Sequence, residues 1–322
     1  MKQLAWRLGH RLLLLVGVSL CTFVLLSAAP GSFFDDLKLN PQVSPATVTK
    51  LQAQYGANRP LPERYARWVE SIFRGDWGYS LSYHRPVGGL VWQRARNTLL
   101  LTTFAVLLAW IIALPWGIAE ALYKGGWIDR TGEVILALLL ATPDVLFALL
   151  LLLLAARTGW FPTGGMSSSE VADLSFGARI WDLARHLFLP VVALALTTLP
   201  ILARHVRSAM IGVLDAPFLS AAKGHGIPKF RLLYRHALPV ALNSLISLFG
   251  FSVGSLLSIS LLVEVILSWP GLGPLVVEAV LARDIYVVVA ATMFSAVCLI
   301  AGNLLADFLL YCTDPRIRSV QS

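Results

Sequence analysis

The stretch best suited to contacting another molecule is residues 220–239, a basic segment between two long apolar runs. Asp215 is the only acid among residues 204–236, so little of the positive charge there is neutralised within the sequence. Short loops rich in Lys and Arg between membrane spans lie on the cytoplasmic side of a membrane. The charge therefore predicts a cytoplasmic segment, and its carriers are Arg204, Arg207, Lys223, Lys229, Arg231 and Arg235.

Two residues of this segment predict a sharp turn. Gly226 is followed two positions later by Pro228. Glycine adopts positive φ without strain, and proline suits the first turn of a helix. We therefore expect two short helices joined by a turn, an ordered arrangement that would serve as a docking element for another protein. The alternative is an ordinary cytoplasmic loop that only obeys the charge rule.

A second group of candidates consists of polar residues inside apolar runs, where they would line a translocation path. Ionisable groups in a membrane span are costly and usually face the bundle interior or water. Asp144 follows Pro143, which weakens a helix, so it could border a cavity. Asn303, Asp307 and Tyr311 share one helical face, for which hydrogen bonding between helices is the alternative role. The candidates are Asp144, Glu264, Asn303 and Asp307.

Two further features of the apolar runs have structural interpretations. Glu120 lies near the inner end of its run, so we expect its side chain to snorkel to the membrane surface. The run after residue 239 is rich in small residues, which allow helices to approach closely or line a polar passage. They are Gly250, Ser252, Gly254, Ser255, Ser258 and Ser260.

The composition is that of a membrane protein. Of 322 residues, 57% are hydrophobic and 14% are charged, whereas soluble domains carry about 25% charged residues. The formal charge of +8 is explained by cytoplasmic Lys and Arg, so it does not indicate a nucleic-acid partner. The three cysteines form no Cys-x-x-Cys pair, which supports neither a disulfide framework nor a zinc site.

Six apolar runs predict an all-α polytopic membrane protein, because each has about the 20 residues needed to cross a bilayer. The first run resembles a signal peptide at Ser27-Ala28-Ala29, but it is long and other spans follow, so we interpret it as an uncleaved helix. Six spans place both termini in the cytoplasm. The predicted spans are Leu12–Ala28, Thr98–Leu122, Val134–Ala156, Leu187–Ala203, Val240–Leu267 and Ile285–Leu310.

The spans divide the chain into four parts. Residues 30–96 are the one long polar region before the end, and we expect helices at Ser44–Tyr55 and Leu61–Phe73 within it. Long translocated segments need not obey the charge rule, so its arginines do not conflict with an outer location. The parts are residues 1–29 with the first span, the extracytoplasmic segment 30–96, a five-helix core 97–313 that contains the loop 204–239, and a cytoplasmic tail 314–322.

The sequence offers no catalytic constellation. The six histidines lie in termini or loops without ligand spacing, and His-Glu-x-x-His and Gly-x-Ser-x-Gly are absent. Gly-x-x-x-x-Gly-Lys-[Ser/Thr], the loop that cradles nucleotide phosphates, is also absent. We therefore predict that the chain is not an enzyme, with no metal site and no cofactor of its own.

The spacing within residues 220–239 resembles a known signature. Ser220, Ala221, Ala222 and Gly226 match the first half of the cytoplasmic EAA motif of ABC-importer permeases, the MetI-like family of binding-protein-dependent transport. His236, Leu238 and Pro239 match the second half. Ser220 replaces the usual acid, and His236 replaces an apolar residue. The residues of this segment are close to those of the subgroup for dipeptides, oligopeptides and nickel. Three other stretches resemble the same subgroup: Gly75–Ser80, Gly159–Pro162 and Glu264–Gly273.

The resemblance implies a permease of the bacterial inner membrane that forms the translocation path and couples to cytoplasmic ATPases. The implied partners are a second permease subunit, two ATP-binding subunits that hold ATP and Mg, an extracytoplasmic substrate-binding protein and the lipid bilayer. The implied substrate is a di- or oligopeptide, with nickel or another small solute as the alternative. The implied ATPase-coupling residues are Ser220, Ala221, Ala222, Lys223, Gly226, Ile227, Pro228, Lys229, His236, Leu238 and Pro239.

Two functions from other classes remain as alternatives. An intramembrane enzyme would need a paired catalytic constellation, and the sequence shows none. An ion channel would need no ATPase. Co-purification of an ATP-hydrolysing partner would separate an importer from both.

Overall fold

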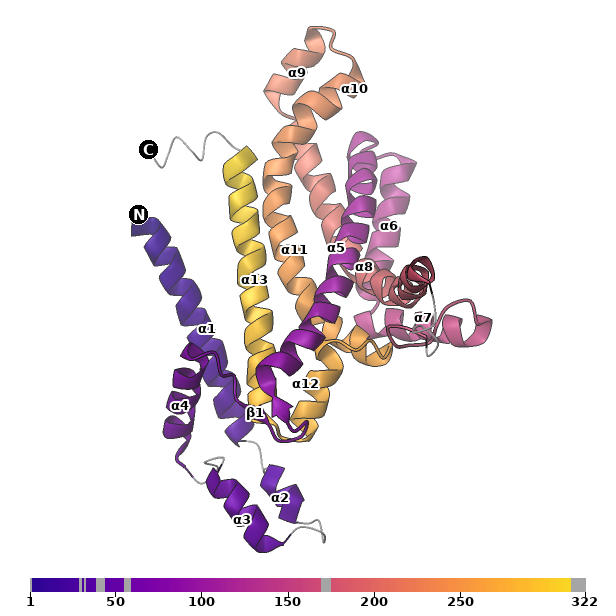
Figure 1. Ribbon diagram of the computed structural model, residues 1–322. Helices are drawn as coiled ribbons and strands as arrows, with labels where there is room; N and C mark the ends of the chain where they lie inside the picture. The colour runs from indigo at the N-terminus through magenta and orange to yellow at the C-terminus, as the bar shows by residue number, and fades with distance from the viewer. Residues whose placement is uncertain are drawn as a thin grey trace. The chain divides into compact units, whose positions relative to one another are not determined.

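The computed structural model describes residues 2–28, 31, 33–38, 44–54, 59–168 and 175–313, and Figure 1 shows that this part of the chain is nearly all helical. The predicted tail 314–322 and the predicted helix end at Tyr55 lie outside the described residues. The chain forms two compact units. The first comprises Met1–Thr98 and Pro270–Val297, and the second comprises Leu99–Trp269 and Cys298–Ser322.

The first unit contains the predicted outer helices. The helix α4 has the predicted bounds Leu61–Phe73, and α3 is Pro45–Gln54. Its other elements are α1 (Lys2–Ala28), α2 (Phe33–Lys38), the strands β1 (Tyr79–Ser80) and β2 (Arg85–Pro86), the first part of α5 (Val87–Leu122), α12 (Leu272–Leu281) and the first part of α13 (Ile285–Thr313).

Aromatic packing holds α4 within this unit. Trp68 of α4 is buried in a cluster with Phe23 of α1 and Val289 of α13. The ring of Tyr65 meets that of Phe23 edge-on, with centroids 5.6 Å apart, and its hydroxyl shares a 2.8 Å hydrogen bond with Ser19. The amphipathic α4 therefore buries its apolar face against a long helix, as surface helices do.

Polar contacts fix the short β1–β2 hairpin and α12 in the same unit. Ser80 donates a 2.7 Å hydrogen bond to Asp284, which lies between α12 and α13. The hydroxyl of Tyr83 donates to Glu278 of α12. Burial and this neighbouring carboxylate raise the pKa of Tyr83 to about 12. The predicted outer re-entry after Trp269 thus contains a ten-residue apolar helix, α12, too short to cross a bilayer by itself.

The second unit is a helical bundle around α8 (Phe176–Leu214), which packs against α6 (Trp127–Ala141), α7 (Asp144–Thr158) and α11 (Leu238–Ile266). Side chains of α5, α7, α8 and α11 meet in one apolar core. Two short helices, α9 (Pro217–Gly224) and α10 (Lys229–Arg231), lie beyond the ends of α8 and α11 (Figure 1). The core includes Leu101, Ala148, Leu189, Leu194, Leu256 and Trp269.

Two small residues of α11 permit close approach of α13. A Cβ atom added to Gly250 would lie 2.3 Å from the Cβ of Ala306, and one added to Gly254 would lie 2.0 Å from Leu299. A larger residue at either position would therefore push the two helices apart. Small residues allow such close approach in many pairs of membrane helices. These glycines serve packing, one of the two roles predicted for the small residues.

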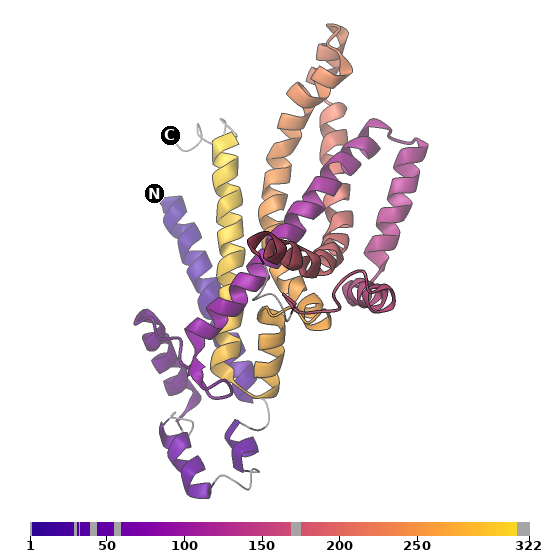
Figure 2. The same cartoon turned by 45° about the vertical axis from the view of Figure 1, so that its right-hand side comes forward.

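Within the described residues, five helices are long and apolar enough to cross a membrane, and the bent pair α6–α7 makes six if counted as one span. The predicted third span is therefore wrong as a continuous helix, because its axis bends by 93° between α6 and α7 (Figure 2). Thr142 at the break is extended, with φ −85° and ψ 123°. The cause is Pro143, which disfavours helical geometry at the preceding residue.

Two further span boundaries differ from the prediction. The helix α5 begins at Val87 instead of Thr98, because Leu90, Val91 and Ala95 continue its buried face. The arginines at positions 94 and 96 lower the local hydropathy and hide this start in the sequence. The helix α8 extends from Phe176 to Leu214, well beyond the predicted fourth span. Residues 204–214 of the predicted loop 204–239 are thus helical.

Candidate functional site

The segment 217–239, which we call the coupling segment, is an ordered arm of the second unit. The helix α9 carries Ser220, Ala221, Ala222 and Lys223, and a turn at residues 225–228 leads into α10. Pro228 precedes α10 with φ −62° and ψ 143°, so the helix begins at Lys229. The predicted order of helix, turn and helix is confirmed.

The turn depends on Gly226. Its φ is +76°, in the left-handed region, which confirms the predicted positive φ. Its N–H donates a 3.0 Å hydrogen bond to the carbonyl of Lys223. A Cβ atom added here would meet nothing within 4 Å. Glycine is therefore required by backbone conformation and not by packing.

The prediction that both helices of the segment are short is wrong for the second one. From Lys229 the chain stays helical through a π-helical turn, Leu232–Ala237, and continues into α11. Pro239 lies just after this turn and lacks the N–H that an α-helix would use. Widening the preceding turn accommodates the proline ring without ending the helix, as π-bulges do.

Buried side chains attach the coupling segment to the bundle. Leu219 of α9 and Leu232, Leu233 and Ala237 of the π-helical turn are buried. They belong to a cluster with side chains of the long helices α5, α8 and α11, so displacement of the segment would displace the bundle. The bundle residues of this cluster are Ile118, Ala121, Val206, Met210, Ala241 and Leu245.

The opposite face of the coupling segment is exposed and basic. Ser220, Ala221, Lys223 and Lys229 are exposed, while Ile227 and His236 are half-buried. The sequence analysis missed an aromatic pair on this face. The rings of Phe230 and Tyr234 lie 4.4 Å apart, and their exposed fractions are 73% and 50%. The signal was present, since two aromatic residues four apart in a basic helix share one face.

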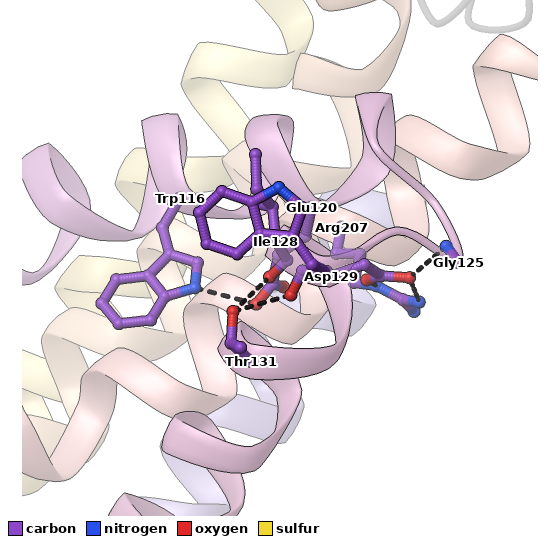
Figure 3. Close-up of polar contacts among 8 residues, drawn as sticks. Trp116, Glu120, Gly125, Ile128, Asp129, Thr131 and Arg207 are labelled. Atoms are coloured by element: carbon purple, nitrogen blue, oxygen red, sulfur yellow. Dashed lines mark hydrogen bonds and ion pairs between the residues drawn. The ribbon is translucent and has the colours of Figure 1, made fainter.

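Next to this segment lies a second polar group that the sequence analysis missed, the Asp129 cluster (Figure 3). The Asp129 carboxylate of α6 accepts hydrogen bonds of 2.6 and 2.9 Å from Arg207 of α8. It also accepts a 2.8 Å bond from the N–H of Gly125 in the α5–α6 turn. Lys124 of that turn pairs at 3.1 Å with Asp215, which ends α8. These contacts tie the α5–α6 turn to the end of α8, just before α9.

The expectation that Glu120 snorkels is wrong. Its side chain is only 1% exposed, and it accepts a 2.8 Å hydrogen bond from the indole N–H of Trp116, as Figure 3 shows. A Cβ atom added to Gly132 of α6 would lie 2.0 Å from the Glu120 carboxylate. The carboxylate is therefore enclosed between α5 and α6, and the small Gly132 leaves room for it.

Asp144 borders a cavity of about 330 Å³ in the second unit. Main-chain and side-chain atoms of α6, α7, α8 and α11 form its wall, and several of them are hydroxyl-bearing residues. The break at Pro143 places Asp144 in the first turn of α7, at the edge of this space. The polar lining consists of Asp144, Thr142, Thr197, Thr198, Ser252 and Ser255.

The other three translocation-path candidates do not line this cavity. Glu264 is fully buried within α11. Asn303 and Asp307 are exposed on α13, together with Tyr311. The structure therefore separates Asp144 from the other candidates, and the role of each in transport stays a prediction.

Comparisons with known proteins show the family of this chain. The family model described as "Binding-protein-dependent transport system inner membrane component" matches residues 99–319. The oligopeptide transport system permease protein AppB of Bacillus subtilis is 36% identical over 306 residues, covering 94% of this chain and 95% of that protein. The dipeptide transport system permease protein DppB of Alkalihalophilus pseudofirmus is 30% identical, covering 98% and 100%.

A solved structure shares the fold. The MetNI methionine ABC transporter in inward-facing conformations aligns with a TM-score of 0.57 and 16% identity. The alignment covers 70% of this chain and 96% of that chain. At this identity the likeness shows a common fold and nothing of substrate.

Proposed function

Because the chain belongs to the family of inner-membrane components of binding-protein-dependent transport systems, we propose that it is the permease subunit of an ATP-driven importer of di- or oligopeptides. The substrate class is supported by relatives named as oligopeptide and dipeptide permeases, which align over nearly their full length. Nickel, the alternative from sequence, becomes an outcome of the test below.

The proposed complex contains a second permease subunit, two cytoplasmic ATPases that hold ATP and Mg²⁺, and an extracytoplasmic substrate-binding protein. Both termini of the chain would be cytoplasmic. The positive charge of the coupling segment supports its cytoplasmic location. The segment 30–96, with α3 and α4, would then lie on the outer side, where a binding protein delivers substrate.

The observation that carries the proposal is the construction of the coupling segment. One face is anchored by buried residues of α9 and the π-helical turn, and the other exposes Lys223, Lys229 and the Phe230–Tyr234 pair. Such a face suits a groove on a partner, because Tyr and Arg are enriched among the side chains that dominate interface energetics, and Tyr234, Arg231 and Arg235 are exposed here. Coupling would arise because contacts with the ATPase differ in free energy between the two states of the bundle.

The test is transport by the whole complex. The permease pair, the ATPases and the cognate binding protein would be reconstituted in proteoliposomes, and uptake of di-, tri- and pentapeptides and of Ni²⁺ would be measured with and without ATP. We expect ATP-dependent uptake of peptides and no uptake of Ni²⁺. Uptake of Ni²⁺ instead of peptides would overturn the substrate class, and flux without ATP or binding protein would overturn the importer.

A further inference from the structure

The wall of the cavity beside Asp144 is mostly apolar, and its polar residues are hydrogen-bond acceptors with almost no free donors. Each hydroxyl of the lining donates its proton to a main-chain carbonyl of its own helix, as is common in membrane helices. Among the described residues, four of these hydroxyl oxygens accept no hydrogen bond, whereas Ser252 accepts one of 3.1 Å from the indole N–H of Trp110. The bonds run from Thr142 to Leu138 (2.8 Å), Thr197 to Ala193 (3.1 Å), Thr198 to Leu194 (3.2 Å), Ser252 to Phe249 (2.7 Å) and Ser255 to Ser252 (3.2 Å).

The carboxylate of Asp144 adds a charge to this wall. Within the described residues, no side chain or N–H forms a hydrogen bond or ion pair with it, and the residues that line the cavity include no Lys, Arg or His. A half-buried carboxylate inside a membrane protein without a cation is costly, so the site favours a cationic occupant.

The competing interpretation is that Asp144 only caps α7. The geometry does not support it, because the N-cap position is Pro143 and no side chain caps the first turn. Hydroxyl residues from α6, α8 and α11 also converge on the same space, which capping of α7 does not require. The feature to be explained is that polar residues of four helices meet at one cavity.

We propose that this cavity binds a primary ammonium group of the transported peptide. An ammonium carries three donors and no acceptor, the complement of this wall. A nickel ion fits less well, because Ni²⁺ favours imidazole ligands and the lining contains none. The volume of about 330 Å³ is at the lower end for ligand pockets, so it suits one end of a peptide and not the whole chain.

The ammonium has two sources, the peptide's amino terminus and a lysine side chain, and the inference rests on the proposed peptide transport. The test compares wild type with Asp144→Asn in the complete complex. Three peptides of one length are used: one with a free amino terminus, its N-acetylated form, and the N-acetylated form with one lysine. Uptake is normalised to the fraction of binding protein loaded with each peptide.

We expect Asp144→Asn to lower uptake of the free-amino peptide on the order of tenfold, since a hydrogen bond to a charged group is lost. Uptake of the N-acetylated peptide without lysine should stay unchanged. A loss for the lysine peptide would assign the site to side chains as well. The matched control is Glu133→Gln, the same carboxyl-to-amide change on the exposed face of α6, which should not discriminate between peptides.

A second measurement avoids the binding protein, which makes its own selection among peptides. In a chain whose three cysteines are replaced by alanine, Thr197→Cys places a thiol on the cavity wall of the full complex. The free-amino peptide should slow maleimide labelling of this thiol several-fold, and Asp144→Asn should remove that protection. The N-acetylated peptide without lysine should not protect.

The outcomes separate the two proposals. If wild type carries no peptide, the proposed function fails. If wild type carries peptides but Asp144→Asn affects free-amino and N-acetylated forms equally, Asp144 acts structurally and the ammonium site is overturned. If no peptide changes the rate at which maleimide labels the Thr197→Cys thiol, the ammonium site is overturned as well.

Discussion

Asp129 and Asp144 both lie in the first turn of a helix, yet their surroundings are opposite. Asp129 lies in α6 and Asp144 in α7, so α6 runs from one to the other. Asp129 is 4% exposed and accepts three hydrogen bonds, two of them from Arg207. Asp144 has no partner among the described residues and borders a cavity.

The helix α8 supplies the difference. Near the α5–α6 turn, α8 presents the cation Arg207 to α6. Nearer its middle, α8 presents Thr197 and Thr198 to the cavity. A carboxylate whose charge is matched within the fold contributes to structure. A carboxylate that shares its cavity with hydroxyl and apolar side chains and no cation keeps its charge available for a ligand. Position in a helix therefore does not decide function, and the neighbouring helix does.

The largest effect on stability is expected for Asp129→Ala. It leaves Arg207, whose side chain is only 29% exposed, without its partner. Removing one member of a buried pair costs more than the pair contributes, so we expect a loss of roughly 3 kcal/mol. Unfolding of the purified chain by SDS in mixed micelles measures it.

The control removes both charges. Asp129→Leu with Arg207→Met leaves no unmatched cation, and apolar replacements of a buried pair are often neutral. This double variant should recover most of the lost stability. If it unfolds as easily as Asp129→Ala, the pair is not the origin of the effect.

The sequence predicts those parts of the fold that depend on local patterns. Apolar runs of about 20 residues locate the membrane helices, because backbone polar groups must be satisfied within each span. The turn at Gly226 follows from two residues whose backbone preferences are strong. The bounds of α4 follow from proline and from the amphipathic spacing around Trp68.

What the sequence does not predict depends on distant neighbours. Asp129 and Arg207 are 78 positions apart, and nothing local distinguishes Arg207 from the other cytoplasmic arginines. Glu120 looked free to reach water, but Trp116 and the small Gly132 enclose it. The bend at Pro143 was visible as a weak point, yet its size depends on how α7 packs against α8 and α11.

A smaller effect on stability, with a large effect on coupling, is expected for Gly226→Asp. The turn is exposed and belongs to neither aspartate site, so it separates loss of coupling from loss of structure. A side chain in the left-handed conformation costs roughly 1 kcal/mol. We expect insertion and folding to persist while ATPase co-purification weakens and hydrolysis no longer follows uptake. Gly226→Ala should act in the same way, more mildly.

Gly224 provides the matched control for this turn. It is also exposed and an added Cβ atom meets nothing within 4 Å, but it has ordinary helical φ. Gly224→Asp should therefore affect coupling less than Gly226→Asp. Equal coupling in all three variants and the wild type would exclude this turn as the docking element.

The smallest effect on stability is expected for Asp144→Asn, and it gives the sharpest contrast with Asp129. The amide has nearly the shape of the carboxylate, and no partner within the described residues is lost, so the change should stay within about 0.5 kcal/mol. Asp129→Asn, the identical chemical change, removes the charge that Arg207 requires and should be clearly destabilising. Both variants are unfolded under the same conditions in SDS micelles. Equal destabilisation would mean that Asp144 also holds the fold together, and a binding role for its charge would then lose its basis.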